Sequence, residues 1–389
     1  MDYRDKLVEN YFSVGFQQNE IISMLELVHR VKVHPRTLKR ILCRLKLCRR
    51  KNYSDIGIVV NFINSQLANS GQLHGYRWMH LKCIQHGLIV TQKTVREVLA
   101  LLDPEGVYIR KRKRLRRRRY FNEGPNAVWH IDSYDKLKRY GICINGAIDG
   151  FSRHIIWLHA GRTSSNPKVI AGYYLSAIMR LGGCPHTIRA DMGTENGTIE
   201  AMQTALCQIF TNPEQCKPPF IYGKSTANQR IESWWSNLRK QCAQFWINLF
   251  ETLDEENMFN GSFLDKSLMQ FCFLKIIQED LDAVVQIWNS HRIRGSKKNR
   301  LCLGRPTIMY QAPSLFGAEN KLIPISEAIL RCLEDQCLFY SNPCDHSIME
   351  LCRNIISENN ITVSVDDPYS AVKLYVDLRT MIIHLMQQH

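Results

Sequence analysis

The sequence predicts a multidomain chain with three parts in series: an α-helical front region, a mixed α/β core and a small helical C-terminal region. Three observations predict this order. The chain has 389 residues, too many for one small core. Basic residues are concentrated before residue 120, and short β-like apolar runs begin near residue 125. With 45% hydrophobic and 22% charged residues the composition is that of a globular protein.

The charge is unevenly distributed along the chain. Residues 1–120 hold 25 Lys and Arg against 9 Asp and Glu, whereas residues 121–389 hold 26 against 27. The net charge of +15 therefore comes from the N-terminal part. A positive field at one end predicts an anionic partner there, and a phosphate backbone is the commonest one. General solubility would not require this segregation.

Residues 1–52 show helix-turn-helix spacing. Two apolar stripes, Ile21–Leu27 and Leu38–Leu45, flank a polar turn that contains Pro35. The second helix carries basic side chains beside its stripe, as a recognition helix facing DNA would. The candidate DNA contacts are Arg36, Lys39, Arg40 and Arg44. A plain solvated helix face is the alternative interpretation.

Residues 53–108 predict a second helix-turn-helix-like unit. GYRWMHLKCIQ and TQKTVREVLALL flank a short connector, and Thr91 is placed to cap the second helix. Lys93 and Arg96 are its candidate DNA contacts.

A basic linker follows at 109–124. Nine of the ten residues 110–119 are basic, so their mutual repulsion predicts an extended arm. Nuclear import signal, DNA-backbone clamp and solubilising run are all open interpretations. The candidate contacts are Arg110, Lys111, Arg112, Lys113, Arg114, Arg116, Arg117, Arg118 and Arg119.

The pattern of segment 125–310 predicts a mixed α/β domain. VWHID, ICINGAID, HIIWLHA, HTIRAD and FIYG predict strands, and helical patterns cover 167–181, 198–210, 228–245 and 266–290. Residues 311–389 predict an acidic, mostly helical region. Its acidity makes it a poor nucleic-acid binder and a candidate surface for a protein partner.

Three carboxylates stand where an isolated structural acid would be costly. Asp132 interrupts an apolar strand, Asp191 ends another, and Glu232 begins a long amphipathic helix. Mg²⁺ or Mn²⁺ is the natural partner, and two such ions would support displacement at a phosphodiester. Each acid alone is more often a cap or a helix-dipole partner. Asp149 and Asp135 are interpreted as a strand-end or turn residue and an exposed loop residue.

Polar side chains near these acids are candidate phosphate contacts, because they can donate hydrogen bonds. They are Asn196, Asn228, Gln229, Arg230, Arg239 and Lys240.

HIDSYDKL, AIDGFSRHIIWL, RADMGTEN and STANQRIESWWSNLRK resemble successive landmarks of the integrase catalytic core, in the superfamily of retroviral integrases and DDE transposases. The resemblance spans 125–310, including the trailing WNSHRIRG and GRPTIMY. It implies a ribonuclease H-like fold, a mixed sheet of five strands flanked by helices. It also implies Asp132, Asp191 and Glu232 as catalytic residues and ligands of two Mg²⁺ or Mn²⁺ ions, with DNA integration as the activity and a homo-oligomer as the active form.

The front half looks more like insertion-sequence transposases and host-encoded or transposon-derived integrase-core proteins, because no HHCC zinc module precedes the core. The chain departs from the family at Met192, where Asn is common, and at Trp235, a position usually polar or basic. Forty residues separate Asp191 from Glu232, more than is common. These departures favour the alternative of a domesticated, catalytically inactive DNA-binding or regulatory protein. A nuclease acting on RNA is a third class. The helix-turn-helix units at the front disfavour it, because such helices fit the wide major groove of B-form DNA and not the deep, narrow groove of RNA.

No phosphate loop, serine-nucleophile elbow or dinucleotide fingerprint occurs in the chain. No apolar run is long enough to span a membrane, and the start resembles no signal peptide. Fourteen cysteines without a CxxC pair fit reduced thiols. We therefore expect a nuclear protein, or a cytoplasmic one in a bacterium, that needs no membrane. The best metal-ligand cluster outside the acids matches no zinc spacing: Cys332, Cys337, Cys344, His346 and Cys352.

Overall fold

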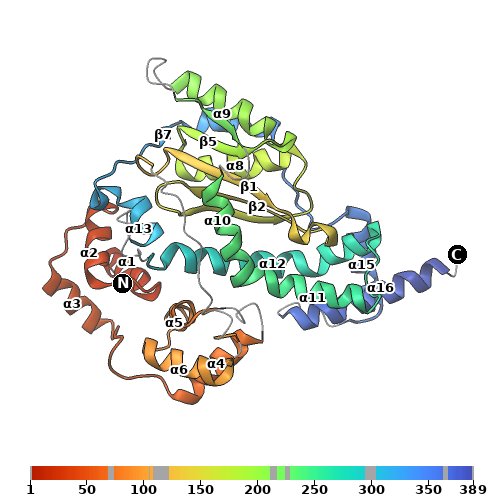
Figure 1. The fold of residues 1–389 in the computed structure, drawn as a ribbon, viewed down its shortest axis with the longest axis horizontal. Helices are drawn as coiled ribbons and strands as arrows, with labels where there is room; N and C mark the ends of the chain where they lie inside the picture. Colours follow the sequence, from red (N-terminus) through yellow and green to blue (C-terminus); the bar gives the residue numbers. More distant parts are fainter. Residues whose placement is uncertain are drawn as a thin grey trace. The chain divides into compact units, whose positions relative to one another are not determined.

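The computed structural model describes residues 2–68, 74–104, 106–107, 122–210, 217–223, 228–293, 304–361 and 367–387 (Figure 1). Contacts divide the chain into two compact units. The first unit comprises Met1–Ala127, Asp149–His154 and Val284–Lys321. The second comprises Val128–Ile148, Ile155–Ala283 and Leu322–His389.

The first unit begins with three helices: α1 (Tyr3–Ser13), α2 (Gln18–Leu27) and α3 (Pro35–Arg44). The predicted helix-turn-helix pair is α2 and α3. Their apolar stripes meet in one core with α1, because residues spaced by three and four positions share a helix face. Ile21, Leu25, Leu38 and Leu42 are among its buried members.

Three further helices follow, of which the sequence predicted the second and third: α4 (Ile56–Leu67), α5 (Tyr76–Gln85) and α6 (Gln92–Leu102). They enclose a separate core that includes Val59, Met79 and Val95. Thr91 caps α6 as expected, since its Oγ1 accepts a hydrogen bond from the backbone N–H of Thr94 at 3.1 Å. The basic run 110–119 lies outside the described residues.

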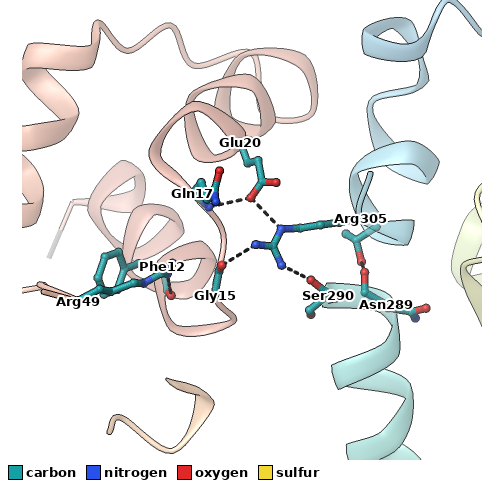
Figure 2. A network of polar contacts seen from close by, with 9 residues as sticks. Phe12, Gly15, Gln17, Glu20, Arg49, Asn289, Ser290 and Arg305 are labelled. Atoms are coloured by element: carbon teal, nitrogen blue, oxygen red, sulfur yellow. Dashed lines mark hydrogen bonds and ion pairs between the residues drawn. The ribbon is translucent and has the colours of Figure 1, made fainter. Parts of the chain in front are cut away.

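A buried arginine joins the first three helices to the segment after residue 284 (Figure 2). The Nε of Arg305 donates to Glu20 Oε2 at 2.7 Å, and its Nη2 donates to the carbonyl of Gly15 at 2.8 Å. Its Nη1 donates to the carbonyl of Ser290. The following helices α13 (Pro306–Gln311) and η7 (Pro313–Phe316) add Ile308 to the core of α1–α3. The segment that begins with Gly304, Arg305 and Pro306 therefore completes the hydrophobic core of α1–α3.

The second unit is built on a five-stranded mixed sheet in the order β3-β2-β1-β5-β6. Strands β1 and β5 are parallel, β5 and β6 are parallel, and β2 and β3 are antiparallel. This is the sheet of five strands that the sequence predicted. The strands are β1 (Val128–Tyr134), β2 (Cys143–Asp149), β3 (Ile155–Gly161), β5 (Thr187–Asp191) and β6 (Phe220–Gly223).

Helices α8, α9 and α10 contact strands of the sheet. Figure 1 shows α9 beside β5 and α10 beside β1, and both pairs are in contact. Helix α8 begins with Pro167 after an Asn166 cap and ends at Leu181, and the next residue, Gly182, caps it with a φ of 68°, the left-handed conformation typical of helix ends. The helices are α8 (Pro167–Leu181), α9 (Gly197–Phe210), α10 (Gln229–Leu238), a π-helical turn (Arg239–Ala243), α11 (Gln244–Glu255) and α12 (Phe263–Ser290).

The C-terminal residues of the second unit are mostly helical, as predicted. Strand β7 (Ile323–Pro324) pairs antiparallel with β4 (Gly183–Cys184). Arg379 donates to Asp265 Oδ1 at 2.8 Å, which fixes the last helix to α12. The helices are α14 (Glu327–Arg331), η8 (Glu334–Gln336), α15 (His346–Glu358) and α16 (Pro368–Gln387). Within the described part of the chain, no helix is both long and apolar enough to cross a membrane.

Candidate active site

Asp132 and Asp191 lie at the same level on neighbouring parallel strands. The register pairs Val128 with Thr187 and His130 with Arg189, and the same offset carries Asp132 to Asp191. Neighbouring strands are about 4.8 Å apart, so the two carboxylates leave the sheet close together. The two strand carboxylates that the sequence picked out are therefore related by the same register offset.

Helix α10 brings the third acid to the same strand. His130, Asp132 and Tyr134 alternate along β1 and so project from one face of the sheet. On α10 the matching face carries Glu232 and Trp235, which are three residues apart. The rings of Tyr134 and Trp235 lie 5.4 Å apart, so this helix face packs on this strand face.

Two buried polar side chains fasten the start of α10 to β1. The Nδ1 of His130 donates to Asn228 Oδ1 at 2.7 Å, and Asn228 Nδ2 donates to the carbonyl of Ile131 at 2.9 Å. The backbone N–H of Glu232 donates to the carbonyl of Asn228 at 3.2 Å, which starts the helix. Burial lowers the pKa of His130 to about 3, against the opposing effect of its bond to Asn228. The imidazole is therefore neutral, and this anchor holds the backbone that carries Glu232.

The three acids are electrostatically coupled. The pKa of Asp132 is raised to about 7, chiefly by burial and also by the charges of Asp191 and Glu232, against the hydrogen bonds from Trp235 and from the backbone of Ser133. Burial also raises the pKa of Asp191 and of Glu232, the latter with a contribution from Asp191. Negative charge is thus disfavoured at this edge of the sheet, which is the environment in which a cation is bound favourably.

The donor set fits a hard divalent cation. Such ions bind carboxylate oxygens, and one oxygen of Asp191, Oδ1, is buried without a hydrogen-bond partner among the residues the structure describes. A cation would satisfy this oxygen. The three acids do not form a preformed metal site in this structure. Within the described ranges, no three His, Cys, Asp or Glu side chains lie close enough together to hold an ion. The described His, Cys, Asp and Glu side chains of segment 332–352 likewise form no group of three that could hold an ion.

Asp149 lies at a strand end as the sequence predicted, whereas Asp135 is exposed as predicted but begins a 3₁₀ helix (Asp135–Tyr140) rather than lying in a loop. Asp149 is fully buried at the end of β2 and accepts bonds from the backbone N–H groups of Asn126, Phe151 and Ser152. It is the turn residue that was expected, with a pKa raised to about 6 by burial. Asp135 is exposed and pairs with Lys138 at 3.0 Å.

The polar residues expected to contact DNA in the core fall into two groups. Asn228 was expected to contact DNA, but it is 1% exposed. Its amide forms hydrogen bonds inside the protein with His130 and Ile131, so it is not available at the surface. Asn196 is also buried and donates to the backbone of Asp191. Arg230 is partly buried. Arg239 and Lys240 are exposed on the π-helical turn, a kind of helix irregularity frequent at functional sites.

The basic side chains of the front helices are presented to solvent. On α3 the apolar residues are buried and the predicted contacts Arg36, Lys39, Arg40 and Arg44 are exposed. Arg44 also forms an ion pair with the buried Asp5 of α1, so part of its charge is neutralised within the fold. Lys93 and Arg96 are exposed on α6. Helix α3 therefore has the amphipathic, basic outer face of a recognition helix.

Sequence reasoning missed two contacts of this site. The sequence marks Trp235 only as a departure from the family, and in the fold its Nε1 donates to Asp132 Oδ2 at 2.6 Å. The buried bond between His130 and Asn228 was also not foreseen. The signal for His130 is strand alternation, which sets it on the face of Asp132, but nothing in the sequence names its partner 98 residues away.

Comparison with known families gives one match. Residues 120–313 match the family described as Integrase core domain, which carries the ribonuclease H-like fold, and this is the segment expected from the sequence. No curated protein matches the chain. The family implies DNA transactions of the integrase and transposase kind, DNA binding, and typically the use of divalent metals.

Proposed function

Because residues 120–313 match the family described as Integrase core domain, we propose that this protein is a DNA-binding polynucleotidyl transferase that cuts or joins DNA strands. The observation that supports the proposal best is the register of β1 and β5. It sets Asp132 beside Asp191, while α10 packs Glu232 over the same face. These are the ligands that we assign to the divalent ions.

Two bound Mg²⁺ or Mn²⁺ ions would supply activation of the attacking oxygen and stabilisation of the leaving oxygen. The chain's own part is to hold three oxygen donors where charge develops. Asp132 and Asp191 are held by the sheet, and Glu232 by the helix start that His130 and Asn228 anchor. Arg239 and Lys240, exposed at the end of α10, are assigned to the phosphate backbone.

The basic front region is assigned to capturing the DNA. The exposed basic face of α3, the side chains Lys93 and Arg96 on α6, and the basic run 110–119 would neutralise phosphates. The same run is proposed as a nuclear import signal. Two DNA ends must meet for strand joining, so we propose that the active form is a homo-oligomer.

The test uses the full-length protein with labelled duplex and nicked DNA in Mg²⁺ or Mn²⁺. We expect nicking or strand transfer, and we expect Asp191→Asn to abolish it. Asp135→Asn is the matched control, because Asp135 follows β1 but is exposed and pairs only with Lys138 among the contacts described for it. Activity that persists in Asp191→Asn, or no activity of the wild-type protein on any DNA, would refute the proposal.

A second candidate is a domesticated DNA-binding regulator that keeps the fold without catalysis. Two observations favour it: Met192, beside Asp191, is 84% exposed, and the described acids form no ready-made metal cage. Calorimetry separates the candidates. Absence of divalent-metal binding at millimolar concentration, together with salt-sensitive DNA binding, would favour the regulator.

A further inference from the structure

Trp235 makes the only described side-chain hydrogen bond to an oxygen of the Asp132 carboxylate. Its Nε1–H donates to Oδ2 at 2.6 Å, the short distance of a bond to a charged acceptor. The side chain of Trp235 is 6% exposed, and its ring lies 5.4 Å from that of Tyr134. The contact is thus a buried, close-packed one.

The chemistry of the indole limits what this contact can do. An indole has one N–H donor and no acceptor, so it bonds a carboxylate oxygen but cannot coordinate a cation. With Oδ2 of Asp132 engaged, Oδ1 is the oxygen left for a ligand. This contact and the backbone hydrogen bond of Ser133 to the same carboxylate limit its rotation, which is how outer contacts orient ligands of metal sites.

Gly146 on the neighbouring strand β2 makes room for this ring. A Cβ added at Gly146 would lie 3.0 Å from Trp235 Cη2 and 3.0 Å from Leu158 Cδ1. Those distances are tighter than ordinary van der Waals contact, so a side chain there would displace the indole. The absence of a side chain on β2 and the large ring on α10 are therefore complementary.

We propose that Trp235 is a positioning residue that bonds Oδ2 of Asp132 and directs Oδ1 alone toward a divalent cation. The proposal rests on the proposed function, because it takes Asp132 to be a metal ligand. Trp235 is three residues after Glu232 on α10, so one helix supplies a ligand and orients another ligand on β1.

The test measures Mn²⁺ binding to the full-length protein by electron paramagnetic resonance, without DNA. We expect Trp235→Phe, which keeps a ring but removes the N–H, to weaken Mn²⁺ binding about 10- to 100-fold. Gly146→Ala should weaken it in the same direction. The matched control is Trp246→Phe: Trp246 Nε1 donates to Asp280 Oδ2 at 3.0 Å, an indole–carboxylate bond with no acid of the trio. It should leave Mn²⁺ binding unchanged.

The outcomes separate the two proposals. If the wild-type protein binds no Mn²⁺, the metal-dependent function fails. If the wild-type protein binds Mn²⁺ and Trp235→Phe binds it equally well or more tightly, the role of Trp235 is refuted and the function stands. Should Trp235→Phe fail to fold, ¹⁵N-indole spectra of the wild type decide. Mg²⁺ and Asp132→Asn should each shift the same indole N–H resonance, and a spectrum in which they do not refutes the contact.

Discussion

The imidazole of His130 and the amide of Asn228, 98 residues apart in sequence, share a buried hydrogen bond of 2.7 Å. Asn228 also donates to the carbonyl of Ile131, so one amide bridges β1 and the start of α10. Glu232 follows in the first turn of that helix. The position of the Glu232 carboxylate therefore depends on the buried hydrogen bonds of Asn228 with His130 and Ile131.

Removing this amide should destabilise the second unit. Asn228→Ala leaves the Nδ1–H of His130 buried without its acceptor, which costs about 1–3 kcal/mol of unfolding free energy. Urea unfolding measures the change. Asn237→Ala is the control, because the hydrogen bond described for its side chain goes to a carbonyl within its own helix, and the change should alter stability by less than about 0.5 kcal/mol. Equal destabilisation in the two variants would contradict the bridging role.

Arg305 and Glu20 should be a stability determinant of the front helices. Their side chains are 8% and 19% exposed, so Arg305→Met leaves a carboxylate largely buried without its partner. We expect a decrease of about 3–5 kcal/mol in stability, and a smaller decrease when Glu20→Gln is added. Hydrogen exchange of α1–α3 measures the effect. Arg331→Met, in the exposed pair with Glu327, should leave stability essentially unchanged, because water and salt screen an exposed ion pair. A double variant as unstable as the single one would argue against the pair.

His291 should make the first unit sensitive to acid. Burial lowers the pKa of His291 to about 4, with help from Arg305 and Arg153, against an ordinary value of 6.5. The unfolded chain therefore takes up a proton before the folded one does. This contribution to stability is present above about pH 6.5 and is lost as the pH falls toward 4, by about 3 kcal/mol in all.

His291→Gln should flatten the pH dependence of stability in that window, because glutamine does not titrate. Its amide can still donate to the carbonyl of Trp288, which His291 contacts at 2.5 Å. Unfolding free energies at pH 4.5 and 7 measure the slope. His384→Gln, at an exposed position on α16, should keep the wild-type slope. An unchanged slope in His291→Gln would show that other groups set the acid sensitivity.

Helix α3 should contribute to DNA affinity by neutralising phosphates. We expect Lys39→Ala combined with Arg40→Ala to weaken DNA binding to all sequences and to reduce the salt slope by about one for each phosphate no longer neutralised. Fluorescence anisotropy at several salt concentrations measures both quantities. Lys373→Ala, exposed on α16 in the acidic C-terminal region, is the control for removing a surface charge. A salt slope unchanged by the double variant would place the DNA elsewhere.

The sequence by itself determined the five strands of the main sheet, most helices of the core and the three acids that they carry. Alternation places His130 and Asp132 on one strand face, and helical spacing buries Leu38 and Leu42 while exposing Arg40. These features depend on residues that are near one another along the chain. For that reason the sheet of the core and the amphipathic front helices could be predicted.

The tertiary structure alone decided which distant groups meet. The bond from Trp235 to Asp132 and the bridge from His130 to Asn228 depend on how α10 packs on β1. The hydrogen bonds of Arg305 to the carbonyls of Gly15 and Ser290 depend on how the segment after residue 304 packs against helices α1–α3. Local periodicity fixes the face on which a side chain lies, but packing and register select its partner across that face, which no spacing along the chain encodes.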